Sequence, residues 1–152
     1  MQKMPMESLI ELILLQLEKG GQANLTVTGN SMHPMLRAKK DSVTLVPANG
    51  NHKKGDVLLY RRENGQYVLH RVIGITEAGY ICSGDNQVMR EPVTQVQVLA
   101  KVSGFSRKGK YYCIEHAGYR IYTLLCVRLF FLRKPYLFIR RCAGRLCRRL
   151  FK

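Results

Sequence analysis

A serine, a histidine and two acids stand in this 152-residue chain where they could together perform acyl transfer. Ser31 lies close to a glycine and a proline, so we expect it in a turn that presents its hydroxyl. A serine hydroxyl is a weak nucleophile and needs a base to take its proton. The neutral imidazole of His70 can serve as that base. An acid that holds the second ring nitrogen fixes the tautomer, and Asp85 and Glu91 are the candidates.

Each of these residues also has an ordinary structural interpretation. A serine near glycine and proline is commonly a turn residue. A histidine in an apolar strand is commonly a hydrogen-bonded core residue, and Gly84-Asp85-Asn86 alone would indicate a hairpin turn. Residue types and spacing alone therefore leave both interpretations open.

The order of the segments resembles a known family, the S24/S26 serine peptidases. This family includes type I signal peptidases and the self-cleaving SOS-type repressors. The resemblance covers roughly residues 20–105 and implies a mainly β (α+β) fold with a twisted sheet. The matching segments are, in chain order, Gly29-x-Ser31-Met32-x-Pro34-x-Leu36, Gly55-Asp56-Val57, His70-Arg71-Val72-Ile73 and Gly84-Asp85-Asn86.

The position of His70 indicates a branch of this family. Common bacterial signal peptidases and the repressors carry a lysine base there, whereas the endoplasmic-reticulum, archaeal and sporulation-type signal peptidases carry histidine. The resemblance therefore implies that Ser31 is the nucleophile and His70 the general base. It offers Asp85 as the third member, with Glu91 as the alternative, because the second acid of this branch is normally Asp. We expect an acid partner to raise the pKa of His70 above its ordinary value of about 6.5.

The oxyanion site departs from many bacterial relatives, which carry serine or threonine two residues before the nucleophile. Gly29 stands there in this chain, which leaves the Ser31 backbone N–H and the Asn30 side chain as candidate donors. Loss of one such donor costs about 2.7–4 kcal/mol in other enzymes. We therefore expect a slow site or one that is built differently.

Hydrophobic periodicity predicts the elements that position these residues. A helix is expected over residues 5–18, followed by a β-rich region to about Ile114. Turns are expected at Asn49-Gly50, Asn64-Gly65 and Lys108-Gly109. The expected strands are Leu25–Thr28, Ser42–Val46, Val57–Tyr60, Gln66–Ile73, Gly79–Cys82 and Val96–Ser103.

The C-terminal part differs in charge from the rest, so we divide the chain into a peptidase-like domain (1–118) and a tail (119–152). Residues 1–118 carry 15 basic and 10 acidic side chains, and residues 119–152 carry ten basic and no acidic ones. After Pro135 the pattern predicts an amphipathic basic helix, typical of helices in the membrane interface. Its expected membrane contacts are Arg140, Arg141, Arg145, Arg148 and Arg149.

Composition limits the remaining possibilities. The five cysteines form no CxxC pair and the four histidines lack zinc-finger spacing, so we expect no metal, no cofactor and no disulfide framework. Free thiols suit a reducing compartment. The apolar stretch at residues 9–17 resembles neither a signal peptide nor a membrane span. These features predict a protein in the cytoplasm or at the cytoplasmic membrane face.

Two classes of function follow from the sequence. The first is a serine endopeptidase of signal-peptidase type, acting on a peptide or precursor protein and cleaving a signal or leader peptide. The second is a catalytically weak peptide-binding or repressor-like module whose basic tail binds nucleic acid or a membrane. We expect an anionic membrane surface and not nucleic acid as partner of the tail, because basic residues alternate there with aliphatic ones.

Overall fold

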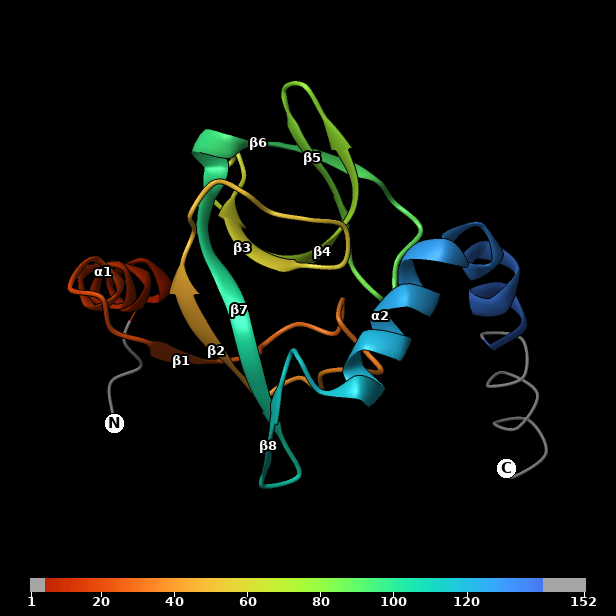
Figure 1. The fold of residues 1–152 in the computed structure, drawn as a ribbon, viewed down its shortest axis with the longest axis horizontal. Helices are drawn as coiled ribbons and strands as arrows, with labels where there is room; N and C mark the ends of the chain where they lie inside the picture. Colours follow the sequence, from red (N-terminus) through yellow and green to blue (C-terminus); the bar gives the residue numbers. More distant parts are fainter. Residues whose placement is uncertain (1–4, 141–152) are drawn as a thin grey trace.

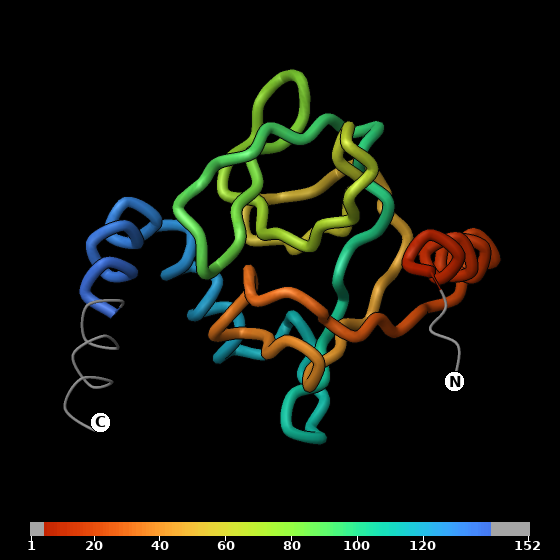
Figure 2. Tube along the Cα trace, turned by 180° about the vertical axis from the view of Figure 1, so that it is seen from behind, coloured from red at the N-terminus to blue at the C-terminus, as the bar shows by residue number. Residues whose placement is uncertain are grey.

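The fold is a curled antiparallel sheet with a helix on either side (Figure 1). The computed structural model describes residues 5–140. Helix α1 (Met6–Glu18) comes first and α2 (Ala117–Arg128) follows the sheet, and the two lie at opposite ends of the molecule in both views (Figures 1 and 2). The mainly β class with terminal helices that the sequence predicts is thereby confirmed.

The sheet has eight strands, all paired antiparallel, in the order β1-β2-β7-β3-β4-β5-β6, with β8 paired to β7. All six strands expected from the sequence are present, each within a few residues of its expected bounds. Two further strands, β6 and β8, were not expected. The strands are β1 (Ala23–Thr26), β2 (Ser42–Pro47), β3 (Val57–Arg61), β4 (Tyr67–Thr76), β5 (Gly79–Ser83), β6 (Glu91–Thr94), β7 (Val98–Arg107) and β8 (Lys110–Cys113).

The curled sheet encloses two apolar clusters that share strand β3. Val57 and Leu59 pack into the larger cluster with α1, β1, β2 and β7, whereas Leu58 and Tyr60 pack into the smaller one with β4, β5 and β6. Successive side chains of a strand point to opposite faces, so a strand buried on both faces lacks charged residues, as β3 does from Val57 to Tyr60. This arrangement places β3 and β4 at the centre of the fold.

The chain after the sheet is helical and packs against the sheet domain. Helix α2 is followed by the short helix η2 (Phe130–Leu132) and by helical residues 133–140. Pro135 lies in the first turn of that last stretch, where its missing N–H is tolerated. Within residues 5–140, no helix combines the length and the apolar character needed to cross a bilayer.

Candidate active site

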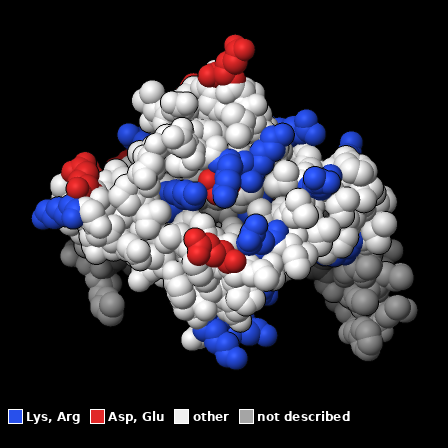
Figure 3. All heavy atoms as spheres, in the orientation of Figure 1, with Lys and Arg blue, Asp and Glu red and all other residues white. Residues whose placement is uncertain are grey.

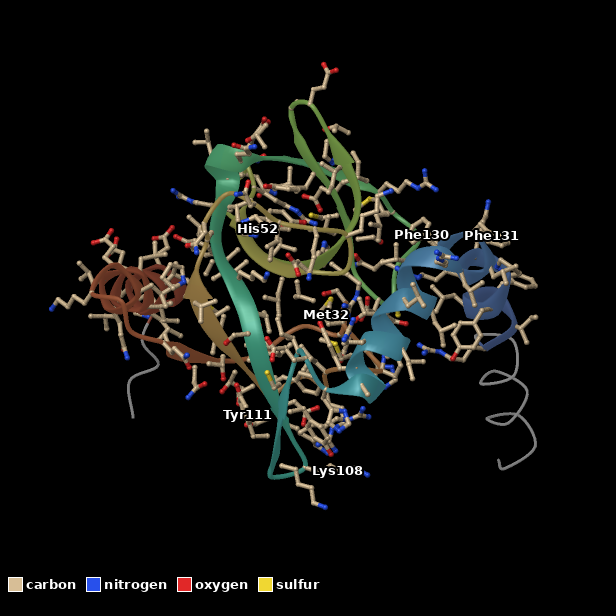
Figure 4. The ribbon with its side chains drawn as sticks, viewed as in Figure 1. Met32, His52, Lys108, Tyr111, Phe130 and Phe131 are labelled. Atoms are coloured by element: carbon tan, nitrogen blue, oxygen red, sulfur yellow. The ribbon has the colours of Figure 1, made fainter. Side chains whose placement is uncertain are left out.

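Ser31 lies in a turn that is anchored to the apolar core by the residues that follow it. The turn spans residues 31–35 and follows β1 after the short connecting segment 27–30. Met32, Met35 and Leu36 are almost fully buried in the larger apolar cluster, and Figure 4 shows Met32 near the middle of the molecule. Ser31 itself is half-exposed, on a turn whose neighbouring side chains are anchored in the core.

Ser31 and His70 line the same cavity. This cavity has a volume of about 570 Å³ and opens between α1, the segment after β1, and the strand β4. Met6, Glu7 and Ile10 of α1 form one wall. Among the described residues no hydrogen bond joins Ser31 to His70, an arrangement that catalytic pairs often show before substrate is bound.

His70 is held by a tyrosine that is in turn held by an acid. The Tyr60 hydroxyl lies 2.9 Å from His70 Nδ1 and 2.9 Å from Glu91 Oε2. Arg62 binds the same carboxylate through two hydrogen bonds, of 2.6 and 2.7 Å. The direct separation of His70 Nδ1 from Glu91 Oε2 is 3.8 Å, so the tyrosine bridges the histidine and the acid.

The protonation states of His70, Tyr60 and Glu91 follow from the hydrogen bonds that join them and from the Arg62 charge beside Glu91. The hydrogen bond from Arg62 holds the pKa of Glu91 below its usual range, so this carboxylate is ionised and only accepts. Burial raises the pKa of Tyr60, which therefore keeps its single proton and donates it to Glu91. The phenol oxygen must then accept from His70 Nδ1–H. This tautomer leaves the Nε2 lone pair of His70 free, as a general base requires.

Burial also sets the titration of His70, which is only 2% exposed. Desolvation lowers the pKa of His70 to about 4, against a smaller opposing effect of Glu91. From the sequence, an acid partner is expected to raise this pKa. The direction is opposite because desolvation of the buried ring outweighs the attraction of Glu91, and the nearby Arg62 charge also lowers the pKa of His70. His70 is therefore neutral at pH 7.

Asp85, the first candidate for the third member, binds Arg71. Both of its oxygens accept from the Arg71 guanidinium at 2.8 Å, and Tyr122 donates to it at 3.0 Å. Arg71 and Asp85 are buried together, with no exposed side-chain area. The structure brings Glu91 to the His70 ring through Tyr60, and it brings Asp85 to the neighbouring arginine.

The alternation of side chains along a strand explains why Glu91 lies near His70 and Asp85 lies near Arg71. His70 and Arg71 are consecutive in β4, so their side chains leave the sheet on opposite faces. Ser83 lies opposite Arg71, and Asp85, two residues later, is on the Arg71 side. Glu91 pairs with Cys82, which pairs with Val72, two residues from His70 and on its face.

The Gly84-Asp85-Asn86 segment supports the Ser31 turn from the side. The Asn86 N–H donates to the Ser31 carbonyl at 2.7 Å, and the Asn86 side chain donates to the Asn30 carbonyl at 3.3 Å. A Cβ at Gly84 would lie 2.7 Å from the Ser31 carbonyl oxygen, so only glycine permits this approach. Figure 2 shows the orange segment after β1 reaching the green turn after β5.

The expected oxyanion donors are only partly in place. The Ser31 N–H makes no hydrogen bond among residues 5–140, so it is free to donate. Asn30 does not line the cavity. Gln87 does, and sequence reasoning did not select it; its Oε1 is buried without a hydrogen-bond partner in the described part of the chain. Tyr60 and Arg62 were also missed, because the sequence gives no sign that they contact His70.

The expected membrane contacts fall mostly beyond the described residues. Arg141, Arg145, Arg148 and Arg149 lie outside the described residues. Arg140 is exposed and donates to Asn86 at 2.8 Å.

No protein-family model matches the chain, and no curated protein matches its sequence.

Proposed function

We propose that the protein is a serine endopeptidase of signal-peptidase type that removes a signal or leader peptide through a Ser31 acyl-enzyme. The observation that carries the proposal is the state of His70. His70 lines the cavity that Ser31 also lines, and its Nδ1–H is held by Tyr60, which leaves Nε2 as the unprotonated nitrogen. A buried neutral imidazole in this tautomer is suited to take the serine proton.

In the proposed reaction, Ser31 Oγ attacks the scissile carbonyl while His70 Nε2 takes the hydroxyl proton. The Ser31 N–H, which has no partner among residues 5–140, would donate to the developing oxyanion. The imidazolium then gives its proton to the leaving amine, and the C–N bond breaks. A water attacks the ester with His70 again as base, releasing the acid and restoring Ser31.

The Glu91 carboxylate, which is paired with Arg62, stabilises the positive charge that His70 carries during the reaction. As His70 becomes cationic, Nδ1–H strengthens its bond to the Tyr60 oxygen, and Tyr60 remains bonded to the ionised Glu91. Tyr60 and Glu91 are thus positioning residues in this proposal. Asp85 acts one step further away, by fixing Arg71 and the turn beside Ser31.

The substrate would bind as an extended strand along the segment that precedes Ser31. Within the described part of the chain β1 pairs with β2 alone, so its other edge carries no strand there. Thr28 and Gly29 line the cavity, and their backbone groups make no backbone hydrogen bond among residues 5–140. A peptide can add to such an edge through main-chain hydrogen bonds. We place this reaction in the cytoplasm or at its membrane face, where thiols such as the buried Cys82 stay reduced.

The test is the appearance of new peptide N-termini in a complex peptide mixture, followed by mass spectrometry. We expect cleavage by the wild type, none by Ser31→Ala, and little by His70→Ala. Ser106→Ala, at a half-buried strand serine, and His116→Ala, at an exposed histidine, are the matched controls and should cleave normally. Equal cleavage by wild type and Ser31→Ala would refute the proposal.

The second candidate is a peptide-binding module without turnover. It is favoured by the missing hydrogen bond between Ser31 and His70 and by Asn30 lying off the cavity. A wild-type protein that binds peptides but produces no new N-termini would support this candidate.

A further inference from the structure

The outer face of the C-terminal helical segment is apolar and exposed. We define the docking surface as Ile121, Leu124, Leu125, Phe131, Phe138 and Ile139, each of which is at least half exposed. Ile121, Leu124 and Leu125 follow the spacing of one helix face of α2, and Figure 4 shows Phe131 on the outer side of the segment. Exposed apolar surface with a polar border marks interaction sites.

The inner face of the same segment is already occupied. Tyr119 and Thr123 lie within hydrogen-bond distance of the Arg71 guanidinium, at 3.1 and 3.0 Å. Arg133 is buried and donates to the Gly84 carbonyl at 2.8 Å, and Leu137 is also buried. These contacts fix the rotation of the segment, so the docking surface stays turned away from the domain.

The charges around the docking surface have one sign. Residues 119–140 contain five basic and no acidic side chains. Arg120, Arg128 and Lys134 are exposed beside the apolar residues. In Figure 3 the lobe formed by α2 and the following helical residues shows white and blue atoms, and the red atoms in that view lie elsewhere.

The apolar centre and the basic border of the docking surface together favour one kind of binding partner over others. A nucleic acid would neutralise the border but would leave the aliphatic centre without a partner, because most of its contacts are to phosphate. A second copy, related by a two-fold axis, would place basic borders against each other. Acyl chains can bury the centre while anionic headgroups neutralise the border.

We propose that residues 117–140 dock the protein peripherally on an anionic lipid bilayer through this surface. The apolar side chains enter the interface, and Arg120, Arg128 and Lys134 lie among the headgroups. The inner face of the same segment holds the Gly84–Gln87 turn beside Ser31. The bilayer would therefore lie on the far side of the segment that supports the candidate site, whether or not Ser31 is catalytic.

The test is co-sedimentation of the full chain with lipid vesicles. Wild type is expected to sediment with vesicles of phosphatidylcholine mixed with phosphatidylglycerol, and not with phosphatidylcholine alone. Leu124→Gln/Leu125→Gln should weaken binding by about tenfold or more, because it removes apolar area from the interface. Leu12→Gln/Leu15→Gln on α1 replaces two leucines of the same exposure and should bind as wild type.

Three outcomes would overturn the proposal. The first is equal vesicle binding by the two double variants. The second is tighter binding of wild type to duplex DNA than to the anionic vesicles at the same salt. The third is a wild-type dimer in light scattering that Leu124→Gln/Leu125→Gln dissociates, together with no vesicle binding.

Discussion

At the scale of single residues, the candidate site depends on a phenol placed between a histidine and an acid. Tyr60 has one proton and two neighbours, and the ionised Glu91 takes that proton. The tyrosine oxygen can then only accept from His70, which sets the tautomer of the ring. Arg62 keeps Glu91 ionised, and it thereby sets the tautomer of His70 through Glu91 and Tyr60.

The roles of the two acids can be separated by substitution. We expect Tyr60→Phe and Glu91→Gln each to lower kcat by at least about tenfold, part of the roughly 10²–10⁴ that a general base supplies, with small changes in KM. Asp85→Asn should instead lower the free energy of unfolding by about 3–5 kcal/mol, because it leaves the buried Arg71 charge unpaired. Steady-state kinetics and urea unfolding of the three variants make the comparison. A Glu91→Gln enzyme with unchanged kcat would contradict the assignment.

The pH dependence of cleavage follows from the burial of His70. The base must be neutral, and burial lowers the pKa of His70 to about 4. Activity should therefore stay level as pH falls from 7 to about 5 and decline as pH approaches 4. The measurement is kcat/KM against pH, within the range where circular dichroism shows a folded protein. A decline centred above pH 6 would mean that His70 is solvated, contrary to the structure.

Sequence reasoning reached the residue types of the site but not their pairing. Ser31, His70 and both acids could be selected because the segments that contain them stand in a characteristic order. The pairing of each acid depends on strand alternation, and the register of β5 and β6 was needed to apply it. The downward shift in the pKa of His70 depends on burial, which a single sequence does not reveal.

At the scale of elements, two turns in contact form one side of the site. The Ser31 turn and the Gly84–Gln87 turn are joined by the bond from Asn86 N–H to the Ser31 carbonyl. Arg133 holds the second turn from outside, through the carbonyls of Gly84 and Gln87. The position of Ser31 is therefore set by the turn after β5, and the C-terminal helical segment holds that turn through Arg133.

A methyl group at Gly84 should disturb this contact. In Gly84→Ala the added carbon would meet the Ser31 carbonyl oxygen at 2.7 Å and Ser31 Cβ at 2.9 Å, so the backbone must shift. We expect a loss of about tenfold or more in kcat/KM, because small misplacements of a nucleophile are costly. Gly118→Ala in α2 is the control, since its added carbon meets only the His116 ring at 3.4–3.5 Å. Normal activity of Gly84→Ala would show that the contact is not needed.

The elements themselves were largely predictable from periodicity and turn residues. Helix α1 and six strands could be found in this way, but β6 and β8 could not. β6 contains Pro92, which weakens a strand assignment, and it lies at the edge of the sheet. β8 is four residues long and is exposed along most of its length, so it has no alternating apolar pattern.

At the scale of the whole molecule, the helical segment after residue 117 is part of the folded unit. Its tyrosines pack against the larger apolar cluster, and it covers the buried Arg71–Asp85 pair. Within residues 119–140 the change in charge at residue 118 coincides with no break in packing, because Arg133 and the tyrosines of α2 contact the domain. Sequence composition could show the charge but not which face packs.

Truncation tests this integration. A chain ending at residue 118 would lose the Tyr119 and Thr123 contacts of Arg71 and the Tyr122 contact of Asp85. Removing partners from buried polar groups costs about 1–3 kcal/mol each. We expect a clearly lower urea midpoint than for a chain ending at residue 140. Equal midpoints for the two truncated chains would show that α2 does not stabilise the domain.

The most direct test of the central claim is covalent labelling of Ser31 by a fluorophosphonate. In this reaction the serine oxygen forms a bond to phosphorus, fluoride leaves, and His70 takes the hydroxyl proton. Peptide mapping of the folded wild type should place the label on Ser31, with Ser106→Ala labelled at the same rate. His70→Ala should be labelled at least about 10² times more slowly, since it lacks the base. A wild-type protein labelled elsewhere or not at all, or a His70→Ala protein labelled at the wild-type rate, would contradict the account.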